Sequence, residues 1–449
     1  MTLIFTLLAF LLLVYAGGTV VYLLVQLAAA AMAKRGLYLN YGRLPAVSTR
    51  PSIVVIIPAH DEELVIAHTL ESLRDQDYDD ERYEIVMVAD NCSDRTADVA
   101  RNHGVRVLER IEPDKRGKGY ALDWAIALLI AEENPADAFV IIDADTAAAP
   151  DFLRIMASRL VTEADARGYC ALQGRYGVLN SKASWRSALM SSAFDLFNHV
   201  RPLGRDWLGL SVGLKGNGMA FSRALLEKAH WSGSSITEDI DFALDLCRTH
   251  NVRVAYVAEA RVAAQMPATA AQASSQRSRW EAGRSRLLRE RGPSLLWEAV
   301  RTRNLLLFES AVDLLMPPLA ELSILLVVWA ALIACGIQIH ALTHPHAWMA
   351  AVAAGSIGLF LYVLGGLAVA DASREAYCAL LFAPFYAVWK LRLQMGRRSR
   401  KSDPPVFVWV RTQRTPIRPV DNTDPQIGPV PPVSASRGNL AVVPVKDSE

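Results

Sequence analysis

The segment Phe139-Val140-Ile141-Ile142-Asp143-Ala144-Asp145 joins a short apolar run to a pair of acids. Four consecutive apolar residues, three of them β-branched, predict a buried strand. The carboxylates of Asp143 and Asp145 then follow the end of that strand. Two such carboxylates can ligate a hard divalent cation, Mg²⁺ or Mn²⁺, that bridges a diphosphate. The alternative is a solvated turn, because this short motif also occurs by chance.

Similar apolar runs surround this segment and define a larger α/β domain. The predicted strands are residues 52–57, 85–88, 105–108 and 139–142, and the predicted helices are residues 63–75, 94–103 and 118–133. Buried strands that alternate with helices indicate a mainly parallel sheet. Ligands bind beyond the carboxyl ends of such strands. The polar residues that follow each strand are therefore the candidate site residues.

Two candidates for binding a nucleotide lie at these positions. Asp90 follows the 85–88 strand and could accept hydrogen bonds from a uracil or a ribose, whereas the nearby Ser93 or Asp94 more plainly caps the next helix. Lys118 stands between two glycines at the start of a predicted helix, which suits a diphosphate contact. The alternative for Lys118 is an exposed basic loop.

Two further motifs lie later in the chain. Thr237-Glu238-Asp239 precedes an amphipathic run, and a carboxylate there could take the proton of an attacking sugar hydroxyl. The alternative is a helix start capped by Thr237. Gln276, Arg279 and Trp280 fall on one helical face, which offers an amide, a guanidinium for phosphate and an indole for a sugar ring. The alternative is a basic helix that rests on anionic lipid.

The amino-terminal segment predicts a membrane anchor over residues 1–35. Residues 3–33 carry no charged side chain, and this uncharged run is long enough to span a bilayer. A cleaved signal peptide is the alternative, but no Lys or Arg precedes the apolar run. Lys34 and Arg35 follow the run, so the chain beyond them is expected in the cytosol.

The carboxyl-terminal part predicts a second membrane region at residues 291–396. We expect spans at about 314–336 and 347–370 and an interfacial helix at about 375–395. Residues 397–449 are expected to form a cytosolic, largely disordered tail, since the segment is rich in proline and polar residues.

Composition excludes some classes of protein. The net charge is only +1, so no nucleic acid is expected as a partner. The five cysteines are scattered, which excludes zinc-ribbon and CxxC redox motifs and fits small buried hydrophobic residues.

The order of these motifs resembles that of family 2 glycosyltransferases with a GT-A fold, of the membrane type that includes cellulose, chitin-oligosaccharide, hyaluronan and poly-N-acetylglucosamine synthases. The matching segments are Pro58-Ala59-His60-Asp61-Glu62-Glu63, Asp90, Gly117-Lys118, Asp143-Ala144-Asp145, Thr237-Glu238-Asp239 and Gln276-x-x-Arg279-Trp280. The resemblance covers about residues 52–290. The family usually has Asn where this chain has Asp61.

The resemblance implies a role for each matching residue. Asp239 would be the catalytic base, and Asp143 and Asp145 would hold the metal. Acceptor contacts would come from Trp280, Asn217 and Glu238, where Asn217 lies in a segment, 215–221, that looks like the family's acceptor strand. Donor contacts would come from Pro58, His60, Glu62, Asp90, Lys118, Asp143, Gln276 and Arg279.

We therefore expect an inverting β-glycosyltransferase of the plasma (inner) membrane, multi-pass, with a cytosolic catalytic domain. It would use a UDP-sugar and Mg²⁺ or Mn²⁺ to extend an exported polysaccharide or oligosaccharide, in contact with membrane lipid. One alternative is transfer of a single sugar to a polyprenyl phosphate or another lipid, although such relatives usually lack the Gln-x-x-Arg-Trp motif. Another is a non-catalytic membrane partner that kept the fold. Three spans are few for a closed polysaccharide channel, so we expect a homodimer, an export partner or short products only.

Overall fold

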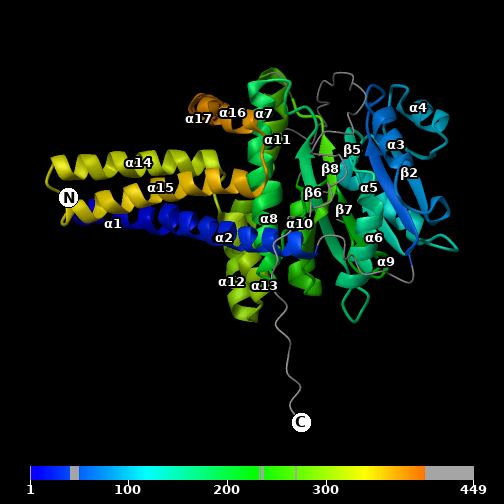
Figure 1. Cartoon of the computed structure of the whole chain (residues 1–449), viewed down its shortest axis with the longest axis horizontal. Helices are drawn as coiled ribbons and strands as arrows, with labels where there is room; N and C mark the ends of the chain where they lie inside the picture. Colours follow the sequence, from blue (N-terminus) through cyan, green and yellow to red (C-terminus); the bar gives the residue numbers. More distant parts are fainter. Residues whose placement is uncertain (1, 41–49, 232, 234–236, 268–269, 400–449) are drawn as a thin grey trace, which may run out of the picture.

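The computed structural model describes residues 2–40, 50–231, 233, 237–267 and 270–399. Two parts are evident in Figure 1, an α/β domain and a rod of long helices that extends away from it. The amino terminus lies at the far end of the rod. The predicted tail, residues 397–449, lies almost entirely outside the described residues.

The domain is built on an eight-stranded sheet in the order β3-β2-β1-β4-β7-β6-β8-β5. Four strands of the first half are parallel, as the sequence predicts. Their bounds are β1 Ile53–Ala59, β2 Tyr83–Asp90, β3 Arg106–Arg110 and β4 Ala138–Ile141. Each ends close to the position at which a polar candidate was expected.

The second half of the sheet is mixed. Strand β7 is antiparallel to β4 and β6, β6 is parallel to β8, and β5 is antiparallel to β8. The bounds are β5 Thr146–Ala148, β6 Ala171–Val178, β7 Met219–Ser222 and β8 Val254–Ala264. The sequence prediction of a mainly parallel sheet therefore holds for β1 to β4 and for the β6–β8 pair, whereas β5 and β7 are antiparallel to their neighbours.

Helices cover both faces of the sheet because side chains alternate along each strand. Val54 and Ile56 of β1 pack with α5 and α10 in one core, whereas Ile53, Val55 and Ile57 pack with α3, α4 and α6 in the other. The helices are α3 Ile66–Arg74, α4 Thr96–Asn102, α5 Lys118–Ile130, α6 Phe152–Glu163 and α10 Glu238–Asp245.

A second group of helices lies between the sheet and the rod (Figure 1). Helix α7 continues through a π-helical turn at residues 195–200 into α8, which packs along α2. The bounds are α7 Trp185–Phe194, α8 Arg201–Trp207, α11 Ala270–Glu290, α12 Gly292–Thr302 and α13 Leu305–Leu315. The short α9, Arg223–Leu226, is not part of this group and directly follows β7.

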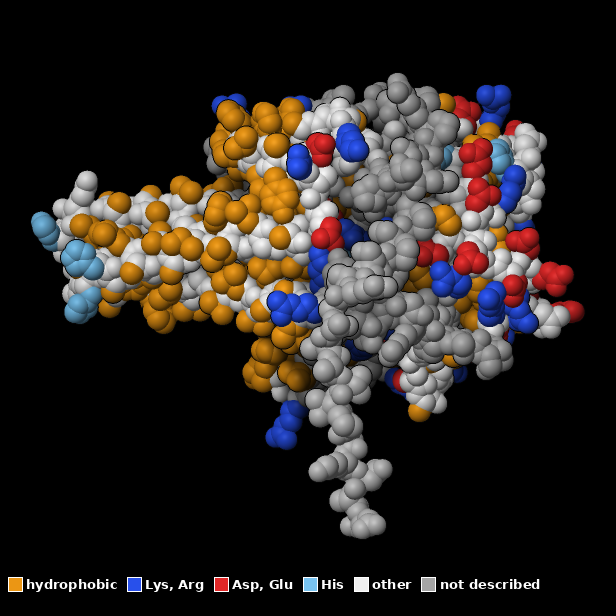
Figure 2. All heavy atoms as spheres, viewed as in Figure 1, with side chains coloured by type: hydrophobic (Ala, Val, Ile, Leu, Met, Phe, Trp, Pro, Cys, Tyr) orange, Lys and Arg blue, Asp and Glu red, His pale blue; other side chains and the backbone are white. Residues whose placement is uncertain are grey.

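Three helices are long and apolar enough to cross a membrane: residues 2–36, Leu319–Gln338 (α14) and Pro345–Val369 (α15). The first combines α1 Thr2–Leu12, a π-helical turn at Leu13–Gly17, and α2 Gly18–Asn40. Figure 2 shows hydrophobic side chains along the whole rod and histidines at its tip, with charged side chains gathered at the opposite end of the molecule. The spans begin and end within a few residues of the predicted positions.

Glycines let these three helices approach closely. A Cβ at Gly358 of α15 would lie 2.6 Å from Val20 Cγ1, and one at Gly365 would lie 2.9 Å from Leu27 Cδ2. Small residues are typical of such contacts between membrane helices.

The segment after α15 forms shorter helices. They are α16 Arg374–Ala379, a 3₁₀ turn at Leu380–Phe382, and α17 Ala383–Ser399. Among the described helices, α17 is not one of those apolar enough to span. Two cysteines, Cys335 of α14 and Cys378 of α16, are exposed, so the expectation of five buried cysteines is wrong for these two.

Candidate functional site

Lys118 joins the end of β4 to the loop before β7. Its ammonium group donates to the carboxylate of Asp143 and to the carbonyl of Gly216. Lys118 begins α5, whereas Asp143 directly follows the strand of β4 and its flanking Ile142. The sheet therefore brings together two residues that the sequence places at separate strand ends.

Asn217 holds the Asp143-Ala144-Asp145 loop in position. Its side chain is fully buried. Its Oδ1 accepts from the backbone N–H of Asp143 at 3.1 Å, and its Nδ2 donates to Thr146 Oγ1 at 2.8 Å. Both the oxygen and the nitrogen of this amide are thus hydrogen-bonded within the protein, although the resemblance predicted an acceptor contact. Asn217 therefore has the geometry of a positioning residue.

Asp239 lies beside Gly216, the residue whose carbonyl accepts from Lys118. Gly216 has a φ of +78°, and a Cβ there would lie 3.3 Å from Asp239 Oδ2 and 3.7 Å from Lys118 Nζ. Glu238 packs against the start of α5, since a Cβ at Gly119 would lie 3.3 Å from Glu238 Cβ. The three separate motifs therefore meet at one place.

Thr237 occupies the position before α10, but its side chain makes no capping hydrogen bond there. The capping role considered from the sequence is therefore wrong. The acids of the first turn still favour the helix start, because its free N–H groups carry partial positive charge.

The acidic groups outnumber the bases in this cluster. Burial raises the pKa of Glu238 to about 7, the charge of Asp239 adds to this, and Lys118 opposes it. Burial also raises the pKa of Asp239, against the effect of Lys118 and Lys215. Burial is the first cause of both shifts, and the charges of Asp239 and Asp143 add to it at Glu238. An additional cation would relieve this excess of negative charge.

Asp143 and Asp145 suit that cation by their chemistry. Both offer carboxylate oxygens, which Mg²⁺ and Mn²⁺ prefer. Asp145 is buried, and its Oδ1 lies 3.4 Å from Thr146 Oγ1. The donor set and the excess negative charge both fit a divalent metal at this loop.

A second acidic group is less suitable. Asp61, Cys92 and Asp94 lie close enough together to offer three ligand atoms. However, Asp61 accepts from the N–H of Ser93 at 2.6 Å, and Asp94 accepts from the N–H of Thr96 at 2.9 Å. These carboxylates already stabilise the turns around them.

Asp90 lies at the expected end of β2, but its carboxylate is engaged by the protein. Arg110 of β3 donates to Asp90 Oδ1 at 2.6 Å, and the N–H of Gly117 donates to Asp90 Oδ2 at 3.3 Å. His60 Nδ1 donates to the Asp90 carbonyl at 2.7 Å. Arg110 was missed in the sequence analysis, although it ends a strand beside the one that carries Asp90.

The segment after β1 forms a tight turn. Asp61 has a φ of +53°, a conformation that Asn and Asp tolerate better than most residues. This explains physically why Asp can stand where the family usually has Asn. Glu62 is buried, and its N–H donates a hydrogen bond to Thr96 Oγ1 at 2.8 Å. Pro58 is partly exposed within β1.

Helix α11 carries the Gln-x-x-Arg-Trp motif. Trp280 is partly buried, whereas the side chains of Gln276 and Arg279 lie outside the described residues. The segment that leads from β8 to α11 begins beside the acidic loop, since the N–H of Gln265 lies 3.4 Å from the Asp145 carbonyl.

Lys215 is a second basic residue that the sequence analysis did not assign. Its ammonium lies 4.2 Å from the centre of the Phe197 ring, which is half exposed. Burial lowers the pKa of Lys215 to about 8. Its position directly before Gly216-Asn217-Gly218 is the sequence feature that could have identified it as a site residue.

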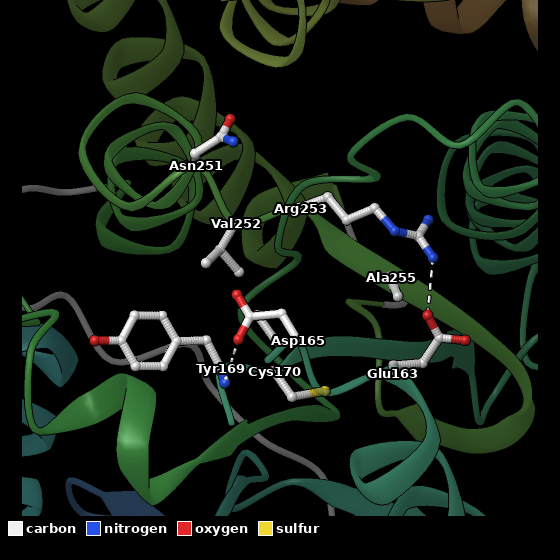
Figure 3. Close-up of a pocket in the computed structure, with 9 residues that line it drawn as sticks. Glu163, Asp165, Tyr169, Cys170, Asn251, Val252, Arg253 and Ala255 are labelled. Carbon is white, nitrogen blue, oxygen red and sulfur yellow. Dashed lines mark hydrogen bonds and ion pairs between the residues drawn. The ribbon is translucent and has the colours of Figure 1, made fainter. Parts of the chain in front are cut away.

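A polar cavity lies at the start of β6 and β8 (Figure 3). Its charged groups are paired, with Arg253 donating to Glu163 at 2.8 Å and the N–H of Tyr169 donating to Asp165 at 3.0 Å. Burial raises the pKa of the Cys170 thiol to about 12, so this thiol is unreactive. The cavity offers no catalytic group.

Comparison with known families gives one matching model, described as glycosyltransferase like family 2, over residues 51–283. The probable glycosyltransferase YdaM of Bacillus subtilis is 26% identical over 243 residues, 52% of this chain and 55% of that protein. A β-monoglucosyldiacylglycerol synthase of Synechocystis is 27% identical over 241 residues, 52% of this chain and 48% of that protein. The chain spans about half the length of these relatives.

Among solved structures, a mannosyltransferase of Pyrobaculum calidifontis in complex with GDP-Man and Mn²⁺ is similar. It is 18% identical, with a TM-score of 0.41, and the match covers 79% of this chain and 98% of that one.

Proposed function

Since this chain belongs to glycosyltransferase family 2 and is a glycosyltransferase, we propose that it transfers a sugar, with inversion, from a UDP-sugar to an acceptor at the cytosolic face of a membrane. The observation that carries this proposal is the convergence of Asp239, Lys118 and Asp143 around Gly216. It puts a base, a cation for the leaving group and a metal-type carboxylate within one small site.

In this mechanism Asp239 accepts the proton of the acceptor hydroxyl, which then attacks the anomeric carbon from the face opposite the leaving group. The bond to the nucleoside diphosphate breaks as the new β-linkage forms. Lys118 orients and balances the departing diphosphate. Asp143 and Asp145 would hold Mg²⁺ or Mn²⁺, which when bound supplies charge stabilisation to the same diphosphate.

The nucleoside would occupy the ends of β1 and β2. His60 and Glu62 line that edge, and Arg110 fixes the carboxylate of Asp90 there. Because Asp90 is already paired, we assign it to shaping the base pocket, together with backbone groups of the turn at Asp61. Gln276 and Arg279 would contact the diphosphate, and Trp280 the acceptor sugar.

Two acceptors remain as candidates. A growing exported polysaccharide or oligosaccharide is the candidate that the Gln-x-x-Arg-Trp motif favours. A lipid acceptor is favoured by the close packing of α15 against α2 at Gly358 and Gly365, since a lipid reaches the site without a pore. The names of two relatives, β-monoglucosyldiacylglycerol synthase and 4,4′-diaponeurosporenoate glycosyltransferase, also favour a lipid acceptor.

The location follows from the charges at the base of the rod. Lys34, near the end of the first span, pairs with Asp371 at 2.6 Å, just after the last span. This supports a multi-pass protein of the inner membrane whose catalytic domain lies on the cytosolic side.

A product assay tests the function. Purified protein in lipid nanodiscs is given a panel of labelled UDP-sugars, and the products are divided between butanol and water and then identified by mass spectrometry. A butanol-soluble monoglycosylated lipid supports the lipid acceptor, and a water-soluble ladder supports the polymer. Absence of any labelled product from all donors would refute the proposed function.

A further inference from the structure

Lys390 is a buried cation on α17, a helix whose first turns also carry exposed apolar side chains. On α17, Phe385 and Val388 are 71% and 52% exposed, whereas Lys390 is only 2% exposed. The exposed apolar residues suit contact with the bilayer surface. A buried ammonium is costly unless it is paired. Lys390 therefore needs partners from the helices that cover it.

Its two partners come from different regions of the chain. Lys390 Nζ donates to Glu321 Oε1 at 3.1 Å, and it forms an ion pair with Glu281 Oε1 at 3.2 Å. Glu321 lies in the first turn of the membrane helix α14. Glu281 lies in α11, directly after Trp280. One ammonium thus joins three helices that are distant in sequence.

A second contact anchors the same face of α11. Arg284 lies three residues after Glu281, so the two side chains share a helical face. Its guanidinium donates to the carbonyl of Leu314 at 3.1 Å and to that of Met316. These carbonyls end α13, just before the start of α14. Helix α11 is therefore held at the base of α14 by two consecutive turns.

We propose that Lys390 is a positioning residue for sugar transfer: with Glu281 and Glu321 it ties the helix that carries Gln276, Arg279 and Trp280 to the membrane helices. The role of Trp280 in this statement rests on the function proposed above. The seating of α17 on the bilayer then sets the position of the acceptor-side helix. Small displacements matter, because a shift of about 1 Å in a reacting group can lower a rate by about 10²-fold.

The test uses full-length protein in nanodiscs and the substitution Lys390→Met, which keeps the length of the side chain and removes its charge. Amide hydrogen exchange is measured separately for α11 and α5. Sugar transfer, UDP-sugar hydrolysis without acceptor, and UDP binding are measured in parallel. We expect faster exchange in α11 only, at least about tenfold slower transfer, a higher KM for the acceptor, and UDP binding within about threefold of wild type.

Two variants serve as controls. Lys390→Arg keeps the cation and should retain most of the transfer activity. Arg286→Met removes an exposed ion pair with Glu290, at 2.9 Å, on the same helix, and should leave both exchange and transfer unchanged. In addition, Lys390→Met combined with Glu281→Gln should cost less than the sum of the two single effects, because each breaks the same contact.

Three outcomes would overturn the proposal that Lys390 positions α11. The first is unchanged exchange and transfer in Lys390→Met. The second is equal loss of transfer, UDP binding and thermal stability in Lys390→Met and Lys390→Arg, which would make Lys390 a purely structural residue. The third is additivity of the two substitutions. If amide exchange in α11 becomes faster in Lys390→Met but the wild type uses no UDP-sugar, the contact between Lys390 and α11 is supported and the proposed function fails.

Discussion

Asp239 is the residue on which the proposed chemistry depends. Its carboxylate lies beside Gly216 and Lys118, whereas Asp143 is engaged by Lys118 and Asn217. Glu238, its neighbour, packs against Gly119. Of these acids, Asp239 has the surroundings best suited to a proton acceptor.

Replacing Asp239 with Asn should remove the base and keep the shape. Base catalysis contributes about 10²–10⁴-fold, so we expect transfer to fall by at least about 10²-fold while UDP-sugar binding changes little. Steady-state rates and calorimetric UDP binding measure the two effects. Glu238→Gln is the matched control, and near wild-type transfer by Asp239→Asn would exclude Asp239 as the base.

The pH dependence should report the Glu238–Asp239 pair. Burial raises the pKa of both Glu238 and Asp239, so the pair loses its protons at a higher pH than ordinary carboxyl groups do, and kcat/KM should fall on the acid side as the pair takes up protons. The positive charge of Lys215 lowers the pKa of Asp239. Lys215→Met should therefore move the acid limb of the profile to higher pH. An unchanged limb in this variant would show that Lys215 does not act on the base.

Removal of divalent metal should abolish transfer if Asp143 and Asp145 hold it. The excess negative charge of the site would then be unbalanced at the leaving diphosphate. We expect a chelator to stop sugar transfer and Mg²⁺ or Mn²⁺ to restore it, as measured by release of UDP. Full turnover in excess chelator would remove the metal from this assignment.

At the scale of elements, the contact between α2 and α15 depends on glycine. Gly358→Ala would put a Cβ 2.6 Å from Val20 Cγ1, whereas Gly18 of α2 has open space around it. Overpacking costs about 1–3 kcal/mol. We expect Gly358→Ala to lower the thermal midpoint in detergent and Gly18→Ala to leave it unchanged or slightly raised. Equal midpoints for the two variants would mean that the helices separate readily at this contact.

At the scale of the whole molecule, the three helices that are long and apolar enough to span would put the catalytic domain and the tip of the rod on opposite sides of a membrane. The turn between α14 and α15 contains His340 and His344 but no Lys or Arg, whereas Lys34 lies at the domain end. The domain end should therefore face the cytosol.

Reporter fusions can test this orientation. A fusion after residue 342, between α14 and α15, should report the outer side, and a fusion after residue 371 should report the cytosol. The opposite pair of signals would invert the proposed topology and remove access of the site to cytosolic UDP-sugar.

The sequence by itself determined the features that depend on local chemistry. The four parallel strands, the positions of their polar ends and the three apolar spans could all be predicted from runs of residues such as 52–57 and 139–142. A strand is identified by its own residues, and a span by its own length and lack of charge.

Only the tertiary structure decided which polar groups are free to act. Asp90 and Asn217 could be located from the sequence, but their partners, Arg110 and Thr146, come from other strands. Segment 215–221, which overlaps β7, looked like the family's acceptor strand, but the antiparallel direction of β7 could not be predicted, because it depends on the pairing with β4 and β6. The pairing of Lys390 with Glu281 and Glu321 could not be predicted either, because the three residues lie on helices that are distant in sequence. A side chain's charge is a property of the residue, whereas its partners are set by contacts between segments far apart in the chain.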